Sequence, residues 1–330
     1  MKLGPLPDRA PVFLKRTLPG EHADAAGAPV LASTAHVAPT RPGAWPTVVT
    51  GLASIGEAPG EEVFYVAEQP HYSRENGVAF SVTEDVAFAC FSSPDIGSLA
   101  EMTEARYSVL LGGLRARGYP HVLRVWNAVP NINGYQDGLE RYRAFSVGRA
   151  AAFSASGLFD AGRYPASTAI GSHGAHLVAY AIATRSPGMH FENAAQVPAH
   201  RYPEQYGPKS PLFCRAVAKV WGASATLFVS GTASITGHES RYAEDIELQV
   251  SQTLQNVHAM VDAARSGTGC DFGIRAGASL LTVYVRNGAD DRVVRRLLEA
   301  HVGKQVSIQY LRADICREEL LVEIEATLSA

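Results

Sequence analysis

The sequence contains little cysteine and no excess of charge of either sign. Its four cysteines lie far apart and form no CxxC pair: Cys90, Cys214, Cys270 and Cys316. This spacing argues against a disulfide framework or a cysteine-based zinc site and favours the reducing cytoplasm. With 29 Lys+Arg against 32 Asp+Glu, no field is present to attract nucleic acid or an acidic membrane surface. An anionic ligand must therefore be bound by a few local arginines.

Long apolar runs and the common nucleotide and nucleophile signatures are also absent. No stretch approaches the roughly 18 apolar residues of a membrane helix, and the first residues have no apolar core of signal-peptide type. Neither a GxxxxGK[ST] loop nor a GxSxG elbow occurs. His173 and His176 have HxxH spacing, but no further His or acidic residue stands near them in sequence. We expect a soluble cytoplasmic protein that uses neither a metal nor an organic cofactor.

The sequence predicts the same order of secondary-structure elements twice along the chain. Each pass runs strand, long helix, strand, shorter helix, and one or two closing strands. The first pass comprises a strand at 85–91, a helix from 99 to about 114, a strand at 121–128, a helix at 139–154 and strand segments within 165–183. The second comprises a strand at 225–234, a helical stripe at 246–264, a strand at 280–286, a helix at 291–301 and strands at 306–310 and 319–326.

This repetition predicts a duplicated α+β domain, with helices packed on one face of each mixed sheet. The period is too long for a solenoid. We divide the chain into a loosely structured N-terminal arm (1–44), a first domain (45–219) and a second domain (220–330).

The second half resembles a known family of small α+β proteins. The segments LFVSGTASI, LLTVYV and LLVEIEATL, with the helices between them, are similar to the Rid (YjgF) family, which shares a chorismate-mutase-like fold. Rid proteins associate as trimers with ligand clefts between subunits. The resemblance implies two Rid/YjgF-like halves with one cleft built from both, in a monomer or a small homo-oligomer.

The first half narrows the resemblance to the chorismatases. The blocks that carry it, in order, are HVLRVWNAVPNIN, ERYRAFSVGRAAAF, PASTAIGSHG, HRYPEQYGPKSPLFCRA, SGTASITGHES and DICREELLVEIE. They extend from about Val86 to the C-terminus. The resemblance implies an enzyme that cleaves the enolpyruvyl ether of the small molecule chorismate and releases pyruvate and 3-hydroxybenzoate. Some 4-hydroxybenzoate is compatible with it.

Chorismate is a dianion, and planar arginine side chains are suited to holding its carboxylates. Tyr142 and Arg149 are seven residues apart, so they share one otherwise apolar helix face. An inward arginine there indicates either an anion site or a buried ion pair. Arg215 shares a strand face with Phe213 and follows Tyr202 in a Pro/Gly-bounded loop, which is equally typical of ordinary packing. The resemblance implies that Tyr142, Arg149, Tyr202 and Arg215 surround the substrate.

The reaction also needs an acid to protonate the enolpyruvyl methylene. Alternation puts Glu323 and Glu325 on one face of the last strand, where two carboxylates are often merely solvated. In both families a ligand-contacting Glu stands first in the EIE motif, and Glu323 matches it. To act as the acid, Glu323 needs a pKa raised by desolvation.

Two small residues match the positions at which the chorismatase subclasses differ. Hydrolysing members carry Ala at both, whereas this sequence has Gly231 and Cys316, as in 3-hydroxybenzoate-forming members. Cys316 also fits the simpler interpretation of a small buried hydrophobe. Two alternatives stay open: a hydrolytic chorismatase giving a dihydroxycyclohexadiene carboxylate, and a Rid-type imine deaminase or metabolite-binding protein. Against the second, Ile308 stands near the position of the carboxylate-binding arginine of Rid proteins.

Overall fold

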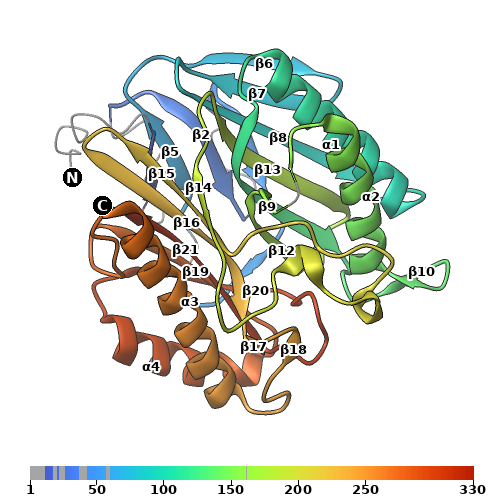
Figure 1. Cartoon of the computed structure of the whole chain (residues 1–330), viewed down its shortest axis with the longest axis vertical. Helices are drawn as coiled ribbons and strands as arrows, with labels where there is room; N and C mark the ends of the chain where they lie inside the picture. The colour runs from blue at the N-terminus through green and yellow to red at the C-terminus, as the bar shows by residue number, and fades with distance from the viewer. Residues whose placement is uncertain (1–11, 18–20, 22–26, 37–42, 57–59, 161) are drawn as a thin grey trace.

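The computed structural model describes residues 12–17, 21, 27–36, 43–56, 60–160 and 162–330. Two mixed β-sheets pack against each other, and a pair of helices covers the outer face of each sheet (Figure 1). Two two-stranded ribbons, β10–β11 (Tyr135–Gln136, Leu139–Glu140) and β17–β18 (Ile235–Thr236, Glu239–Ser240), border the loops at one end. None of the helices in these described ranges is long and apolar enough to cross a membrane.

The first sheet has six strands and carries helices α1 (Leu99–Ala116) and α2 (Arg141–Ser156). In spatial order its strands are β12 (Ala166–Ser172), β9 (His121–Pro130), β13 (His176–Thr184), β8 (Val86–Pro94), β7 (Val78–Val82) and β6 (His71–Glu75). Only β12 and β9 pair in parallel; the other neighbours are antiparallel.

The second sheet carries helices α3 (Ile246–Thr268) and α4 (Asp291–Val302). Its strands, in spatial order, are β14 (Met189–Phe191), β15 (Ala216–Trp221), β16 (Ser224–Ala233), β21 (Val322–Ser329), β19 (Ser279–Val285), β20 (Ser307–Arg312) and the short β4 (Ala53–Ser54). Local signals explain the helix limits. Asp245 caps α3 by accepting the Leu248 N–H at 3.0 Å, and Gly269, with φ 74°, ends it.

The two sheets have the same topology. The order β12-β9-β13-β8-β7-β6 matches β20-β19-β21-β16-β15-β14, with one parallel pair in each, β9/β12 and β19/β20. The helices follow equivalent strands in both halves. The predicted duplicated α+β fold is therefore confirmed, and each predicted strand and helix is present with ends displaced by a few residues.

The N-terminal region differs from the expectation of a loosely structured arm. Its described residues include strands β1 (Val12–Arg16) and β2 (Val30–Ala35), which pair with β5 (Glu62–Val66); β3 (Thr47–Val49) completes the sheet in the order β1-β5-β2-β3. Much of the rest of 1–44 lies outside the described residues. The proposed division between residues 219 and 220 falls inside β15, which belongs to the second sheet together with β14.

Alternation along β21 positions the site. Val322, Ile324 and the following alternate residues pack toward α3 and α4 in the apolar core of the second half. Glu323 and Glu325 therefore point the other way, toward the first sheet. Contacts between the sheets confirm this orientation, because Glu325 meets Arg124 of β9.

Candidate active site

Two adjoining pockets open between the sheets beside helix α2, and all seven residues singled out in the sequence line them. The larger one, called the outer pocket, spans about 590 Å³ of space, part of which is open to solvent. Both pockets share Tyr142, Gly231, Cys316 and Glu323; Arg149 lines the inner one, and Tyr202 and Arg215 line the outer one. These residues come from α2, β16, β21 and the loops before β15 and β21, so the fold brings together segments from both halves.

Glu323 is a buried carboxyl group without a partner. Its side chain is 4% exposed, and in the described part of the chain no hydrogen bond or ion pair reaches it. Burial, reinforced by the neighbouring Glu325 charge, raises the pKa of Glu323 to about 8, while Arg124 and Arg215 oppose the rise. At neutral pH this group therefore holds a proton in a cleft of low polarity.

Glu325, two residues further along β21, is also buried but has several hydrogen-bond partners. Its carboxylate accepts Arg124 Nη2 at 2.7 Å, Thr168 Oγ1 at 2.5 Å and Trp126 Nε1 at 3.1 Å. Arg124 opposes the rise in pKa that burial causes for Glu325. The interpretation of the two glutamates as a solvated pair is wrong, because both are buried, one paired and one free.

Gly231 leaves the space that the Glu323 carboxyl group occupies. A β-carbon at position 231 would lie 2.0 Å from Glu323 Oε1 and 3.0 Å from Thr168 Cγ2. The register of β16 against β21 shifts between Val229 and Thr232, and the Gly231 N–H donates to Thr168 Oγ1 at 2.9 Å. The missing side chain thus makes room for the carboxyl group.

Arg149 lies on the inner face of α2, as the seven-residue spacing from Tyr142 predicts. It is 2% exposed, its Nη1 donates to Ser167 Oγ at 3.2 Å, and its Nε has no partner. No ion pair to Arg149 occurs among the described residues, which disfavours the alternative of a structural ion pair. A buried guanidinium without an anion is costly, so an anionic ligand is the natural partner.

Arg215 and Tyr202 form a second, positively charged wall of the outer pocket. Arg215 is 3% exposed, its Nη2 donates to the Tyr202 hydroxyl at 2.6 Å, and its Nε has no hydrogen-bond partner among the residues that the structure describes. Its guanidinium carbon lies 5.1 Å from the centre of the Phe213 ring. The Tyr202 loop is therefore part of the pocket and not an ordinary surface loop.

Cys316 lies in a loop that a half-buried arginine holds in place. Arg286 forms an ion pair with Asp314 at 2.7 Å and donates to the carbonyl groups of Ile315 at 2.9 Å and Arg317 at 3.0 Å. Burial and the neighbouring Glu323 raise the pKa of Cys316 to about 12, so its thiol stays protonated. Cys316 is thus a neutral wall of the cleft, while Arg286 is a positioning residue that sequence patterns did not reveal.

Arg317 is a charged pocket residue that the sequence interpretation missed. Its Nη1 donates to His238 O at 2.9 Å and to Ser240 Oγ at 3.0 Å, and its guanidinium carbon lies 4.0 Å above the Tyr206 ring. No carboxylate pairs with it in the residues that the structure describes. By contrast Arg143, also at this pocket, is paired with Glu140 at 2.9 Å. The only signal in the sequence was its place directly after Cys316.

Comparisons with known proteins identify the family of this chain. The family model described as "Chorismatase FkbO/Hyg5-like, N-terminal" matches residues 62–183. A chorismatase of Streptomyces rapamycinicus is 38% identical over 273 residues, which cover 80% of each chain. The chain belongs to the chorismatase family.

Further relatives of this chain include a 3-hydroxybenzoate synthase of Streptomyces hygroscopicus, 34% identical over 88% of this chain and 87% of that protein. A crystal structure of a chorismatase aligns with 98% of this chain and 100% of its own, with a TM-score of 0.88 and 30% identity. RidA from a Psychrobacter species aligns with 43% of this chain and 98% of its own, with a TM-score of 0.31 and 19% identity.

Proposed function

We propose that this protein cleaves chorismate to pyruvate and 3-hydroxybenzoate, with Glu323 as the acid. The observation that carries the proposal is a buried, unpaired carboxyl group with a pKa near 8, in pockets also lined by Arg149 and Arg215. The guanidinium groups bind the two carboxylates of the substrate, and the walls exclude water. The names of the relatives, chorismatase and 3-hydroxybenzoate synthase, support this substrate.

In the proposed reaction Glu323 donates its proton to the methylene carbon of the enolpyruvyl group. The resulting oxocarbenium ion draws the electrons of the ring carbon–oxygen bond, and pyruvate leaves. The adjacent ring hydroxyl oxygen bonds to the carbon thus freed and gives up its proton, which restores neutrality. The original carbon–oxygen bond of that hydroxyl group then opens, the carbon that now carries the oxygen loses its ring proton, and the oxygen regains a proton, which gives the aromatic 3-hydroxybenzoate. Tyr142 and Tyr202 position the ring and the enolpyruvyl group.

The decisive experiment mixes purified protein with chorismate and follows pyruvate with a coupled lactate dehydrogenase assay. Chromatography of the ring product then separates 3-hydroxybenzoate, 4-hydroxybenzoate and the dihydroxycyclohexadiene carboxylate of the hydrolytic alternative. Absence of pyruvate would leave the Rid-type metabolite-binding alternative.

Gly231→Ala is expected to change the product. The new methyl group would overlap Glu323 Oε1, so the carboxyl group must turn away from its present position. Small misplacements of reacting groups have large effects on rate, and we expect hydroxybenzoate formation to fall by roughly tenfold while the hydrolysis product gains. Gly231→Ala combined with Cys316→Ala should extend the shift. Chromatography measures the ratio of hydroxybenzoate to hydrolysis product. An unchanged ratio in the double variant would show that neither residue determines the product.

Arg317 is proposed as an additional carboxylate anchor at the outer pocket. Because a hydrogen bond to a charged group contributes about 1.5–3 kcal/mol, Arg317→Gln should raise KM for chorismate roughly tenfold or more. The effect on kcat should be small if ground state and transition state are held equally. Arg143→Gln is the matched control, since Glu140 already neutralises Arg143. Equal KM values for the two variants would contradict the proposed role.

A further inference from the structure

Ser167 of strand β12 has a hydroxyl group whose hydrogen-bonding role is fixed by its neighbours. The side chain is 4% exposed and lines the inner pocket together with Arg149, Cys316 and Glu323. Its Oγ accepts Arg149 Nη1 at 3.2 Å and Asn127 Nδ2 at 3.3 Å. A serine hydroxyl group has two acceptor positions and one hydrogen. Because the two N–H donors fill both acceptor positions, the group can act only as a donor toward a third partner.

Asn127 is held so that its amide nitrogen faces Ser167. Its Nδ2 also donates to the Thr168 carbonyl at 2.8 Å, and its Oδ1 accepts the Tyr107 hydroxyl. Both Asn127 and Tyr107 are buried. Exchanging the amide oxygen and nitrogen would place two acceptors, Oδ1 and the Thr168 carbonyl, against each other. The hydrogen-bond partners of Asn127 therefore keep Ser167 in the role of a donor.

The hydroxyl hydrogen of Ser167 has no acceptor among the residues that the structure describes. The backbone N–H of Ser167 is used separately, since it donates to Ser230 Oγ at 2.8 Å. Ala169, the next residue on the same face of β12, also lines the inner pocket. A buried donor without an acceptor costs free energy, so this hydrogen indicates that a ligand supplies the acceptor.

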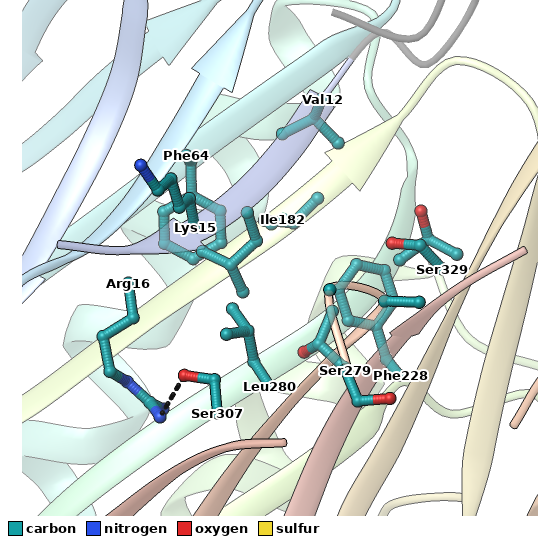
Figure 2. Close-up of a pocket in the computed structure, with 15 residues that line it drawn as sticks. Val12, Lys15, Arg16, Phe64, Ile182, Phe228, Ser279, Leu280, Ser307 and Ser329 are labelled. Carbon is teal, nitrogen blue, oxygen red and sulfur yellow. Dashed lines mark hydrogen bonds between the residues drawn. The ribbon is translucent and has the colours of Figure 1, made fainter. Parts of the chain in front are cut away.

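A second arginine–serine pair shows how the charge of such an arginine is otherwise neutralised. At a pocket between β1 and the second sheet, Arg16 donates to Ser307 Oγ at 3.3 Å (Figure 2). Glu62 pairs with Arg16 there at 2.5 Å. Arg149 makes the same kind of contact with Ser167, but no carboxylate pairs with it in the described ranges. The inner pocket thus offers one positive charge and one hydroxyl hydrogen to an anion.

We propose that Ser167 donates its hydroxyl hydrogen to the substrate carboxylate that Arg149 binds, and that Asn127 positions it for this contact. The inference rests on the proposed function, because the anion is a carboxylate of chorismate. Donation from Arg149 and Asn127 to Ser167 Oγ polarises the hydroxyl group and strengthens its bond to the carboxylate. Ser167 is therefore a further substrate-binding residue.

The test measures the dissociation constant of chorismate by isothermal titration calorimetry, in protein that carries Glu323→Gln so that the substrate is not consumed. Adding Ser167→Ala should weaken binding roughly tenfold or more, the scale of a hydrogen bond to a charged group. Ser167→Cys nearly keeps the volume but donates weakly, and should give a similar loss. Ser307→Ala is the matched control and should leave the affinity unchanged, because the pocket of Ser307 shares no lining residue with the active-site pockets.

Arg149→Gln distinguishes direct donation by Ser167 from an effect exerted through Arg149. If Ser167 contacts the substrate, Ser167→Ala should still weaken binding severalfold in the Arg149→Gln background. No further loss in that background, unchanged affinity in Ser167→Ala, or failure of chorismate to bind at all would overturn the proposal. Pyruvate release by the wild-type protein tests the proposed function separately. Binding that depends on Ser167 without any pyruvate release would reject the reaction and support the contact.

Discussion

Replacing Glu323 by Gln lowers the rate of pyruvate release from chorismate by at least about two orders of magnitude, the scale expected for removal of a general acid. Gln keeps the shape of the side chain and removes the proton that the enolpyruvyl methylene must receive. The coupled dehydrogenase assay measures the loss. Because we propose that Arg149 and Arg215 hold the substrate carboxylates, KM should change much less than kcat. A variant with wild-type turnover would eliminate Glu323 as the acid.

The pH dependence of the wild-type protein is the companion measurement. The pKa of Glu323 is raised to about 8, so the protonated form predominates below that pH and declines above it. Activity should accordingly fall as the pH rises through about 8. The same shift predicts that Glu323→Gln is not destabilising: keeping the proton in the folded state costs free energy between the ordinary pKa of 4.5 and about 8, and Gln avoids this cost. Lost turnover in a stable variant separates catalysis from folding.

Replacing Glu325 by Ala has its main effect on stability. Arg124 is 1% exposed and Glu325 6% exposed, so the substitution leaves a buried guanidinium without its anion. We expect the free energy of unfolding to fall by about 3–5 kcal/mol, the range for breaking a buried ion pair by removing one partner. Urea denaturation measures this loss.

The control for Glu325 is the double variant Arg124→Met, Glu325→Leu. Replacing both charges by apolar side chains removes the unpaired cation, so much of the stability should return. Glu323→Gln provides the second comparison, because it alters a neighbouring carboxyl group that has no ion-pair partner. If Glu325→Ala were as stable as Glu323→Gln, the assignment of one structural and one catalytic glutamate would fail.

Much of the fold followed from periodicity. The strand and helix patterns from residue 85 onward are strong because each element has one apolar face, and both passes appear as predicted, from β8 to β13 and from β16 to β21. The strands before residue 85 were not predicted. They are short, and β2 and β5 are buried on both faces, so they lack the alternation that marks a half-buried strand.

The candidate site was predicted through the resemblance more than through spacing. Tyr142 and Arg149 share a helix face, which the sequence shows directly, but nothing in the sequence relates that face to Glu323. The sequence also could not predict the environment of each glutamate. Alternation places Glu323 and Glu325 on one face, and only the packed sheets reveal that Arg124 and Thr168 meet Glu325 and leave Glu323 free. Arg317 was missed because its stacking on Tyr206 joins residues distant in sequence.

The sequence by itself determined the duplicated order of elements, the buried faces of the helices and strands, and the side-chain chemistry available. These are local properties, because periodicity and side-chain type act over a few residues. The tertiary structure alone decided which carboxyl group is paired, which arginines are free, and why residue 231 has no side chain. Those outcomes depend on desolvation and on contacts between strands far apart in the chain, and both exist only after the two sheets have packed together.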